Sequence, residues 1–114
     1  MTPVRELLFF EDYFESFFNN QSKKVKEKIN QVFYLLTHVE RVPEKFLKKL
    51  TGHTGLYEIR IEFGGNIFRI FCCFDNGNII VLFNGFQKKS MKTPIREIER
   101  AIRLMDLYFN TKQP

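Results

Sequence analysis

The chain has 114 residues, of which 44% are hydrophobic and 14 are phenylalanine. It is therefore long enough to bury a core of its own and too apolar to be disordered, and we expect a single domain spanning residues 1–114. The formal net charge of +5 favours an acidic partner, such as nucleic acid or an acidic protein. A basic protein without such a partner is also compatible with a charge of this size.

The positions of the cysteines and histidines, and the absence of several short motifs, exclude several classes of protein. Cys72 and Cys73 are adjacent on one expected strand, so their side chains point to opposite faces and a bond between them is implausible. With His38 and His53 they give no known zinc spacing, and we expect no metal and no cofactor. Phosphate-binding glycine loops, nucleophile elbows and dinucleotide fingerprints are missing. No signal peptide or membrane-spanning apolar run is present, so we expect a cytoplasmic protein without a membrane partner.

The first half of the chain predicts one short strand and two helices. Residues 4–10 form an apolar run that we expect to be an edge strand, although it could also begin a helix. Residues 12–18 carry aromatic side chains at helical spacing, and Asn19 and Asn20 end this helix. Ser22 caps a second, longer helix. Its apolar stripe consists of Val25, Ile29, Val32, Phe33, Leu36 and Val39. Residues 43–50 are expected to form a turn of helix or an extended link, followed by a loop over residues 51–55.

Residues 56–86 predict three antiparallel strands joined by two tight turns. The pairs Gly64-Gly65 and Asn76-Gly77 supply the positive φ values of two-residue hairpin turns. The first turn places Phe63 opposite Asn66, Ile61 opposite Phe68, Arg60 opposite Arg69, and Ile59 opposite Ile70. The second turn places Asp75 opposite Asn78, Phe74 opposite Ile79, Cys72 opposite Val81, and Arg69 opposite Asn84. By alternation, the expected core face consists of Tyr57, Ile59, Ile61, Phe68, Ile70, Cys72, Phe74, Ile79, Val81 and Phe83.

The chain ends in a third amphipathic helix. Thr93 is the expected N-cap and Pro94 the first helical residue. The apolar stripe consists of Ile95, Ile98, Ile102, Met105 and Phe109. The order β-α-α-β-β-β-α predicts an α+β fold built on an antiparallel sheet. The two N-terminal helices cover its core face, the last helix covers part of the other face, and a partner protein could cover the rest.

Two arginines face each other in the middle of this sheet. Arg60 and Arg69 are like charges on neighbouring strands, an arrangement that is usually unfavourable. They could simply extend into solvent or pair with Glu58 and Glu62. Alternatively they face an anion, and a phosphate is the anion we expect, because guanidinium groups recognise it well. The neighbouring cations and aromatic ring would suit single-stranded RNA. These neighbours are Phe86, Lys88, Lys89 and Lys92.

The motifs of the second half resemble a known family. They are Lys49-Leu50, the strand Leu56 to Arg60, Phe68-Arg69-Ile70 and the string from Gly85 to Ser90, followed by Lys92-Thr93-Pro94 and a helix through Ala101. From about residue 45 to 105 the chain resembles the phage-derived Gp49-like and HigB-like branch of the RelE/ParE toxin superfamily. The resemblance implies a RelE-like toxin that cleaves mRNA, usually on the translating ribosome. It also implies an antitoxin partner, typically a helix-turn-helix protein encoded beside it.

The resemblance also implies roles for individual residues. Arg69, Lys89, Arg60 and Glu58 are expected to be catalytic. Lys88, Phe86, Lys92, Lys49 and Asn84 are expected to bind RNA. In this chemistry an RNA 2′-hydroxyl attacks the adjacent phosphate without a metal, while Arg69 and a lysine stabilise the developing charge and Arg60 holds the backbone. The proton-transfer residues stay open among Glu58, Tyr57, His53 and the lysines.

Asn84 marks a departure from the family pattern. Many relatives carry a histidine just before the G-F-x-K-K string, and this chain has Asn84 there. Two alternatives stand beside the ribonuclease. One is a degenerate, non-catalytic module that binds RNA or an antitoxin. The other is a ParE-like toxin with a target other than RNA, such as gyrase.

Overall fold

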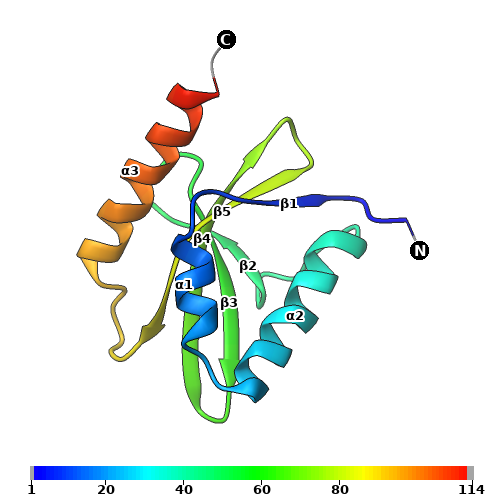
Figure 1. Cartoon of the computed structure of the whole chain (residues 1–114), viewed down its shortest axis with the longest axis vertical. Helices are drawn as coiled ribbons and strands as arrows, with labels where there is room; N and C mark the ends of the chain where they lie inside the picture. The colour runs from blue at the N-terminus through cyan, green and yellow to red at the C-terminus, as the bar shows by residue number, and fades with distance from the viewer. Residues whose placement is uncertain (1, 113–114) are drawn as a thin grey trace.

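The computed structural model describes residues 2–112, which build one five-stranded sheet with helices on both faces (Figure 1). The elements in chain order are β1 (Glu6–Phe9), α1 (Tyr13–Asn19), α2 (Lys23–His38), β2 (Leu47–Lys49), β3 (Tyr57–Phe63), β4 (Asn66–Asp75), β5 (Ile79–Lys88) and α3 (Ile95–Thr111). The strands lie side by side in the order β1-β5-β4-β3-β2. The pairing of β1 with β5 is parallel and the other pairings are antiparallel. The predicted α+β fold is confirmed, with β2 as an additional strand.

Helices α1 and α2 pack together on one face of the sheet, as predicted. The stripe of α2 is buried there against apolar residues of β3, β4 and β5. Ser22 caps α2 as expected, because its Oγ accepts a hydrogen bond of 3.2 Å from the backbone N–H of Val25. At the other end Arg5 donates to the backbone oxygens of Leu36 and Val39, at 3.0 and 2.7 Å. Both ends of α2 are thus satisfied, and the helix is fixed over the core.

Helix α3 covers part of the opposite face, over β4 and β5. Its buried residues are Ala101, Leu104 and Tyr108. Four residues of the predicted apolar stripe are partly buried against the sheet, whereas Ile95, the first residue of the helix, is 73% exposed. The N-cap is Pro94, one residue later than predicted, and no side chain caps the helix.

The register of the first hairpin is confirmed at every predicted pair, including Arg60 opposite Arg69. Gly64 and Gly65 alone separate β3 from β4, and their φ values of +60° and +82° fit a two-residue turn that only glycine adopts without strain. A two-residue turn leaves no freedom in the pairing that follows it. The arginine pair is therefore set by this turn.

The predicted register of the second hairpin is wrong. Three residues separate β4 from β5, so Asp75 pairs with Ile79. A bulge then follows, where Phe71 lies opposite both Phe83 and Asn84 because the flanking pairs join Ile70 to Gly85 and Cys72 to Leu82. As a result Ile80 and Leu82 lie on the α1/α2 face, whereas Val81 and Phe83 lie beneath α3. Arg69 pairs with Phe86, not with Asn84.

Strand β2 replaces the turn of helix or extended link expected for residues 43–50. It is an edge strand in which Lys48 pairs with Glu58 and Lys49 pairs with Tyr57. Residues 51–55 form a loop, as expected. Within residues 2–112, no helix has both the length and the apolar character needed to cross a membrane.

Candidate nucleic-acid interface

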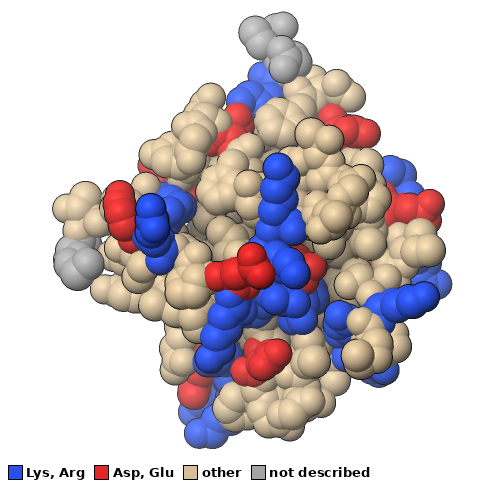
Figure 2. All heavy atoms as spheres, turned by 180° about the vertical axis from the view of Figure 1, so that it is seen from behind, with Lys and Arg blue, Asp and Glu red and all other residues tan. Residues whose placement is uncertain are grey.

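Basic residues gather on the side of the sheet that carries α3, beside that helix. Strand alternation and register place Lys48 of β2, Glu58 and Arg60 of β3, Arg69 of β4 and Lys88 of β5 on this side. We call these five residues the arginine face. Figure 2 shows Lys and Arg side chains clustered at the centre of this side, with acidic side chains among them. The predicted juxtaposition of the two arginines is therefore part of a wider basic surface.

Glu58 joins the two arginines. Its Oε2 lies 2.8 Å from Nε of Arg69 and 3.5 Å from Nε of Arg60. Arg69 and Glu58 are 4% and 6% exposed, so their attraction acts away from water and is weakly screened. Burial lowers the pKa of Arg69, Arg60 lowers it further, and Glu58 counteracts both effects. Nη1 of Arg69 also donates to the backbone oxygen of Phe68 at 3.1 Å. One carboxylate thus holds two guanidinium groups together.

The two arginines differ in how far solvent reaches them. The side chain of Arg60 is 29% exposed, whereas that of Arg69 is 5% exposed. An anion from solution would therefore meet Arg60 first. Arg69 lies beneath the surface, where its charge acts at short range in a low-dielectric setting.

The lysines fall on different sides of the sheet. Lys88 is half-buried on the arginine face, opposite Ile67. Lys89 and Lys92 are exposed in the segment between β5 and α3. Lys49 alternates to the α1/α2 side of β2, and Lys48 takes its place beside Glu58. Sequence reasoning missed Lys48 because it missed β2, whose alternation would have identified this residue.

Phe86 and Asn84 are buried beneath α3. Phe86 is 8% exposed and packs on Phe71, with ring centroids 5.5 Å apart. Asn84 is 2% exposed, and its Nδ2 donates to the backbone oxygen and Oε1 of Glu97 at 3.2 and 3.0 Å. Through these contacts, Phe86 and Asn84 attach α3 to the sheet. A direct contact between either of them and RNA would require α3 to move.

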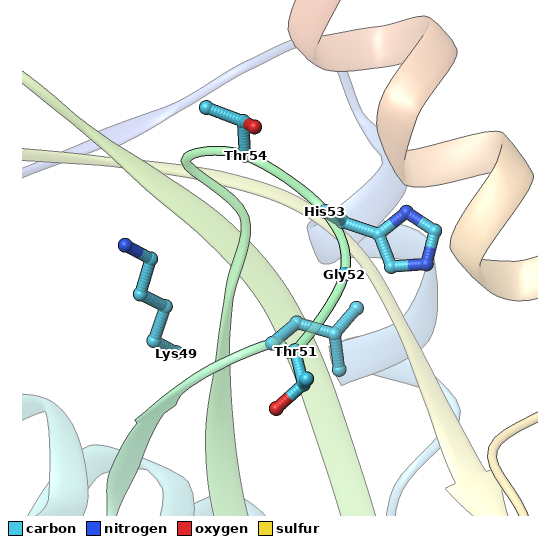
Figure 3. Close-up of a pocket in the computed structure, with 6 residues that line it drawn as sticks. Lys49, Thr51, Gly52, His53 and Thr54 are labelled. Carbon is cyan, nitrogen blue, oxygen red and sulfur yellow. The ribbon is translucent and has the colours of Figure 1, made fainter.

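The other two proton-transfer candidates lie apart. Tyr57 is on the α1/α2 side, where its ring packs edge-on against Phe74 at 5.0 Å, so the sheet separates it from Arg69. His53 is in the loop after β2, which lines an open pocket of about 460 Å³. Figure 3 shows His53 extending to the side of this loop on which α3 lies, whereas Lys49 extends to the other side. Among residues 2–112, no three His, Cys, Asp or Glu side chains are grouped as metal ligands.

A basic face on a mostly antiparallel sheet, with two N-terminal helices and one C-terminal helix packed on it, fits the α+β toxin that the resemblance to RelE-like toxins implies. Residues 16–106 match the family model of phage-derived Gp49-like proteins (DUF891). The chain therefore belongs to the Gp49-like family, a branch of the RelE/HigB-like toxins. Membership makes it a toxin module of the toxin–antitoxin type, with an antitoxin as its partner. No curated protein matches the chain.

Proposed function

We propose that this toxin module is a metal-free endoribonuclease of a type II toxin–antitoxin system that cleaves mRNA on the translating ribosome. The observation that carries the proposal is the convergence of Arg60 and Arg69 on one carboxylate oxygen of Glu58, at 3.5 and 2.8 Å. Two guanidinium groups from adjacent strands that share one anion form a site into which a phosphate oxygen can enter. Family membership supports an RNA target over other anions.

The proposed reaction is an internal transesterification. The 2′-hydroxyl of one nucleotide attacks the adjacent phosphorus, Glu58 accepts the hydroxyl proton, and the bond to the 5′-oxygen of the next nucleotide breaks. Lys89 donates a proton to that leaving oxygen. The products are an upstream fragment that ends in a 2′,3′-cyclic phosphate and a downstream fragment that begins with a 5′-hydroxyl.

The arginine face supports distinct roles in this reaction. Arg60 and Lys88 hold the phosphate from the solvent side. Arg69 stabilises the additional negative charge that develops on the phosphate oxygens, because a buried cation held by Glu58 needs no reorganisation when that charge appears. Lys92, in the exposed segment before α3, extends the contact along the RNA backbone. His53 is the alternative proton donor, from the α3 side of its loop.

The second candidate is a non-catalytic module that binds RNA or an antitoxin on the same face. Asn84 favours it, because an amide bound to Glu97 stands where many relatives carry a histidine able to transfer protons. A third candidate, a ParE-like toxin, would act on a target other than RNA.

Inducible expression separates the three candidates. The wild type should arrest growth and produce new mRNA 5′ ends, whereas Arg69→Ala and Arg60→Ala should do neither. Because Arg69 is buried, its variant can lose activity through misfolding. Arg60→Ala removes a partly exposed side chain and provides the folded comparison, checked by circular dichroism. Arrest without new ends would indicate another target, and no arrest at equal protein levels would indicate the binding module.

A further inference from the structure

A small basic notch lies at the edge of β3, next to the arginine face. It has a volume of about 120 Å³ and is lined by Lys28, Lys45, Phe46, Arg60 and Glu62. We call it the β3-edge notch. It forms where β2 begins: the β2 ladder starts at Leu47 opposite Ile59, and the backbone N–H of Arg60 donates to the oxygen of Phe46 at 2.8 Å. Helix α2 borders the same edge and contributes Lys28.

The charges of the notch are not balanced within the protein. Three cations and one carboxylate line it, and of these cations Arg60 also pairs with Glu58 on the arginine face. Within residues 2–112, the ion pairs of the protein include neither Lys28 nor Lys45. The ammonium group of Lys45 lies 5.5 Å from the ring centroid of Phe46 instead. These lysines are therefore free to bind an external anion.

We propose that the β3-edge notch binds one phosphate of the RNA backbone, adjacent to the phosphate held on the arginine face. This inference rests on the proposed function. Arg60 lines the notch and also belongs to the arginine face, so a strand bound at the face can continue across the β3 edge without leaving basic surface. Figure 2 shows the central cluster of Lys and Arg side chains continuing toward the edge of the molecule.

A single phosphate fits the notch better than an acidic protein segment does. With a volume of about 120 Å³, the notch has room for a compact anion such as a phosphate group but not for a helix. The three cations come from α2, from the segment before β2 and from β3, and they line the same small pocket. An acidic helix would instead require a row of cations along one surface, and the remaining α2 lysines, Lys23, Lys24 and Lys26, do not line the notch.

The test measures RNA binding without cleavage. A fluorescein-labelled 2′-O-methyl oligonucleotide lacks the attacking hydroxyl, and its anisotropy gives the dissociation constant at several salt concentrations. The double variant Lys28→Ala/Lys45→Ala removes two notch cations. Lys23→Ala/Lys24→Ala removes the same charge from exposed positions of the same helix and is the matched control.

The notch variant should bind more weakly than the control, and the slope of log K against log salt should become shallower by ~0.7, the value for one single-strand phosphate. Equal slopes for the two double variants would overturn the inference, and so would a wild type that does not bind the oligonucleotide. If oligoglutamate, but not RNA, binds less tightly to the notch variant, the notch is an acidic-peptide site and the inference is wrong. Cleavage of mRNA on programmed ribosomes is scored separately, so a wild type that binds the oligonucleotide but leaves this mRNA intact would refute the proposed function alone.

Discussion

Glu58 is the residue on which the arginine face depends. Arg60 and Arg69 face each other directly on neighbouring strands, an arrangement of like charges that costs roughly 0.2–1 kcal/mol or more when buried. Glu58 offsets this cost because one of its carboxylate oxygens forms ion pairs with both guanidinium groups. It therefore has a structural role in addition to the proton transfer we propose.

We predict that Glu58→Gln lowers the free energy of unfolding by on the order of 3 kcal/mol, because it leaves the nearly buried Arg69 without its counter-charge. Urea denaturation at neutral pH measures the loss. Glu62→Gln, at an exposed position of the same strand, is the control and should change the midpoint little. Equal midpoints for the two variants would show that Glu58 does not hold the arginine pair.

Lys48 and Lys49 offer a direct test of which side of the sheet binds RNA. They are adjacent in β2, but Lys48 faces Glu58 and Lys49 faces Tyr57 on the opposite side. Lys48→Ala should weaken RNA binding and reduce the salt slope by ~0.7, whereas Lys49→Ala should leave the slope unchanged. The measurement is the anisotropy titration with 2′-O-methyl RNA. A larger effect at Lys49 would place the RNA on the α1/α2 side of the sheet and contradict the proposed site.

At the scale of elements, α3 is tied to the hairpin between β4 and β5 by a buried carboxylate. Asp75 accepts hydrogen bonds from the hydroxyl of Tyr108 and from Nζ of Lys112, both at 2.6 Å. The hydrogen bonds from Lys112 and Tyr108 lower the pKa of Asp75. The hydrogen bond between Tyr108 and Asp75 also raises the pKa of Tyr108 to about 12. The C-terminal end of α3 is thereby held while its sides pack over Phe83 and Phe86.

This contact predicts a dependence of stability on alkaline pH. The ordinary pKa of Tyr108 is 10.0 and the folded value is about 12, so the folded state holds the proton more tightly than the unfolded state. The stabilisation that the Tyr108–Asp75 hydrogen bond provides is complete below pH ~10 and is lost as the pH rises through ~12. The difference in unfolding free energy between the wild type and Tyr108→Phe should therefore shrink by about 2 kcal/mol across this window.

Denaturation of the wild type and Tyr108→Phe from pH 8 to 12 measures this difference. Both proteins contain the same lysines, so the effect of lysine titration drops out of the difference. Tyr34→Phe, at a 54% exposed position, should differ from the wild type by a constant amount. A constant difference for Tyr108→Phe as well would mean that the hydroxyl does not bind Asp75.

The elements differ in how well the sequence predicts them. Gly64 and Gly65 define the first hairpin because a two-residue turn allows one pairing. Asn76 and Gly77 also adopt positive φ, but they belong to a three-residue loop, and a bulge at Phe71 shifts the register again. Neither the loop length nor the bulge has a distinct local sequence signal.

Strand β2 and the β3-edge notch could not be predicted from the sequence either, because both depend on tertiary contacts. With three residues, β2 is too short for alternation to be recognised, and it is a strand because β3 offers it an edge. The notch unites residues of α2, the segment before β2 and β3, and only the tertiary packing brings them together. The arginine pair could be predicted because a single turn determines it.

At the scale of the whole molecule, the helices leave one basic surface open. Helices α1 and α2 cover one face of the sheet, and α3 covers the β4–β5 part of the other. The cations of β2, β3 and β5 lie on this second face, beside α3, and Figure 2 shows Lys and Arg side chains clustered at the centre of that side. An antitoxin that covers this surface would block the proposed site by occupying it.

The chemistry of the RNA ends tests the proposed ribonuclease most directly. Purified wild-type protein is incubated with mRNA on programmed ribosomes, and the fragments are analysed with and without prior phosphorylation by a polynucleotide kinase. We predict downstream fragments that ligate only after phosphorylation, because they begin with a 5′-hydroxyl, and a rate ~10²-fold lower for Arg60→Gln. Intact mRNA after incubation with the wild type, or fragments that carry a 5′-phosphate, would contradict the proposed reaction.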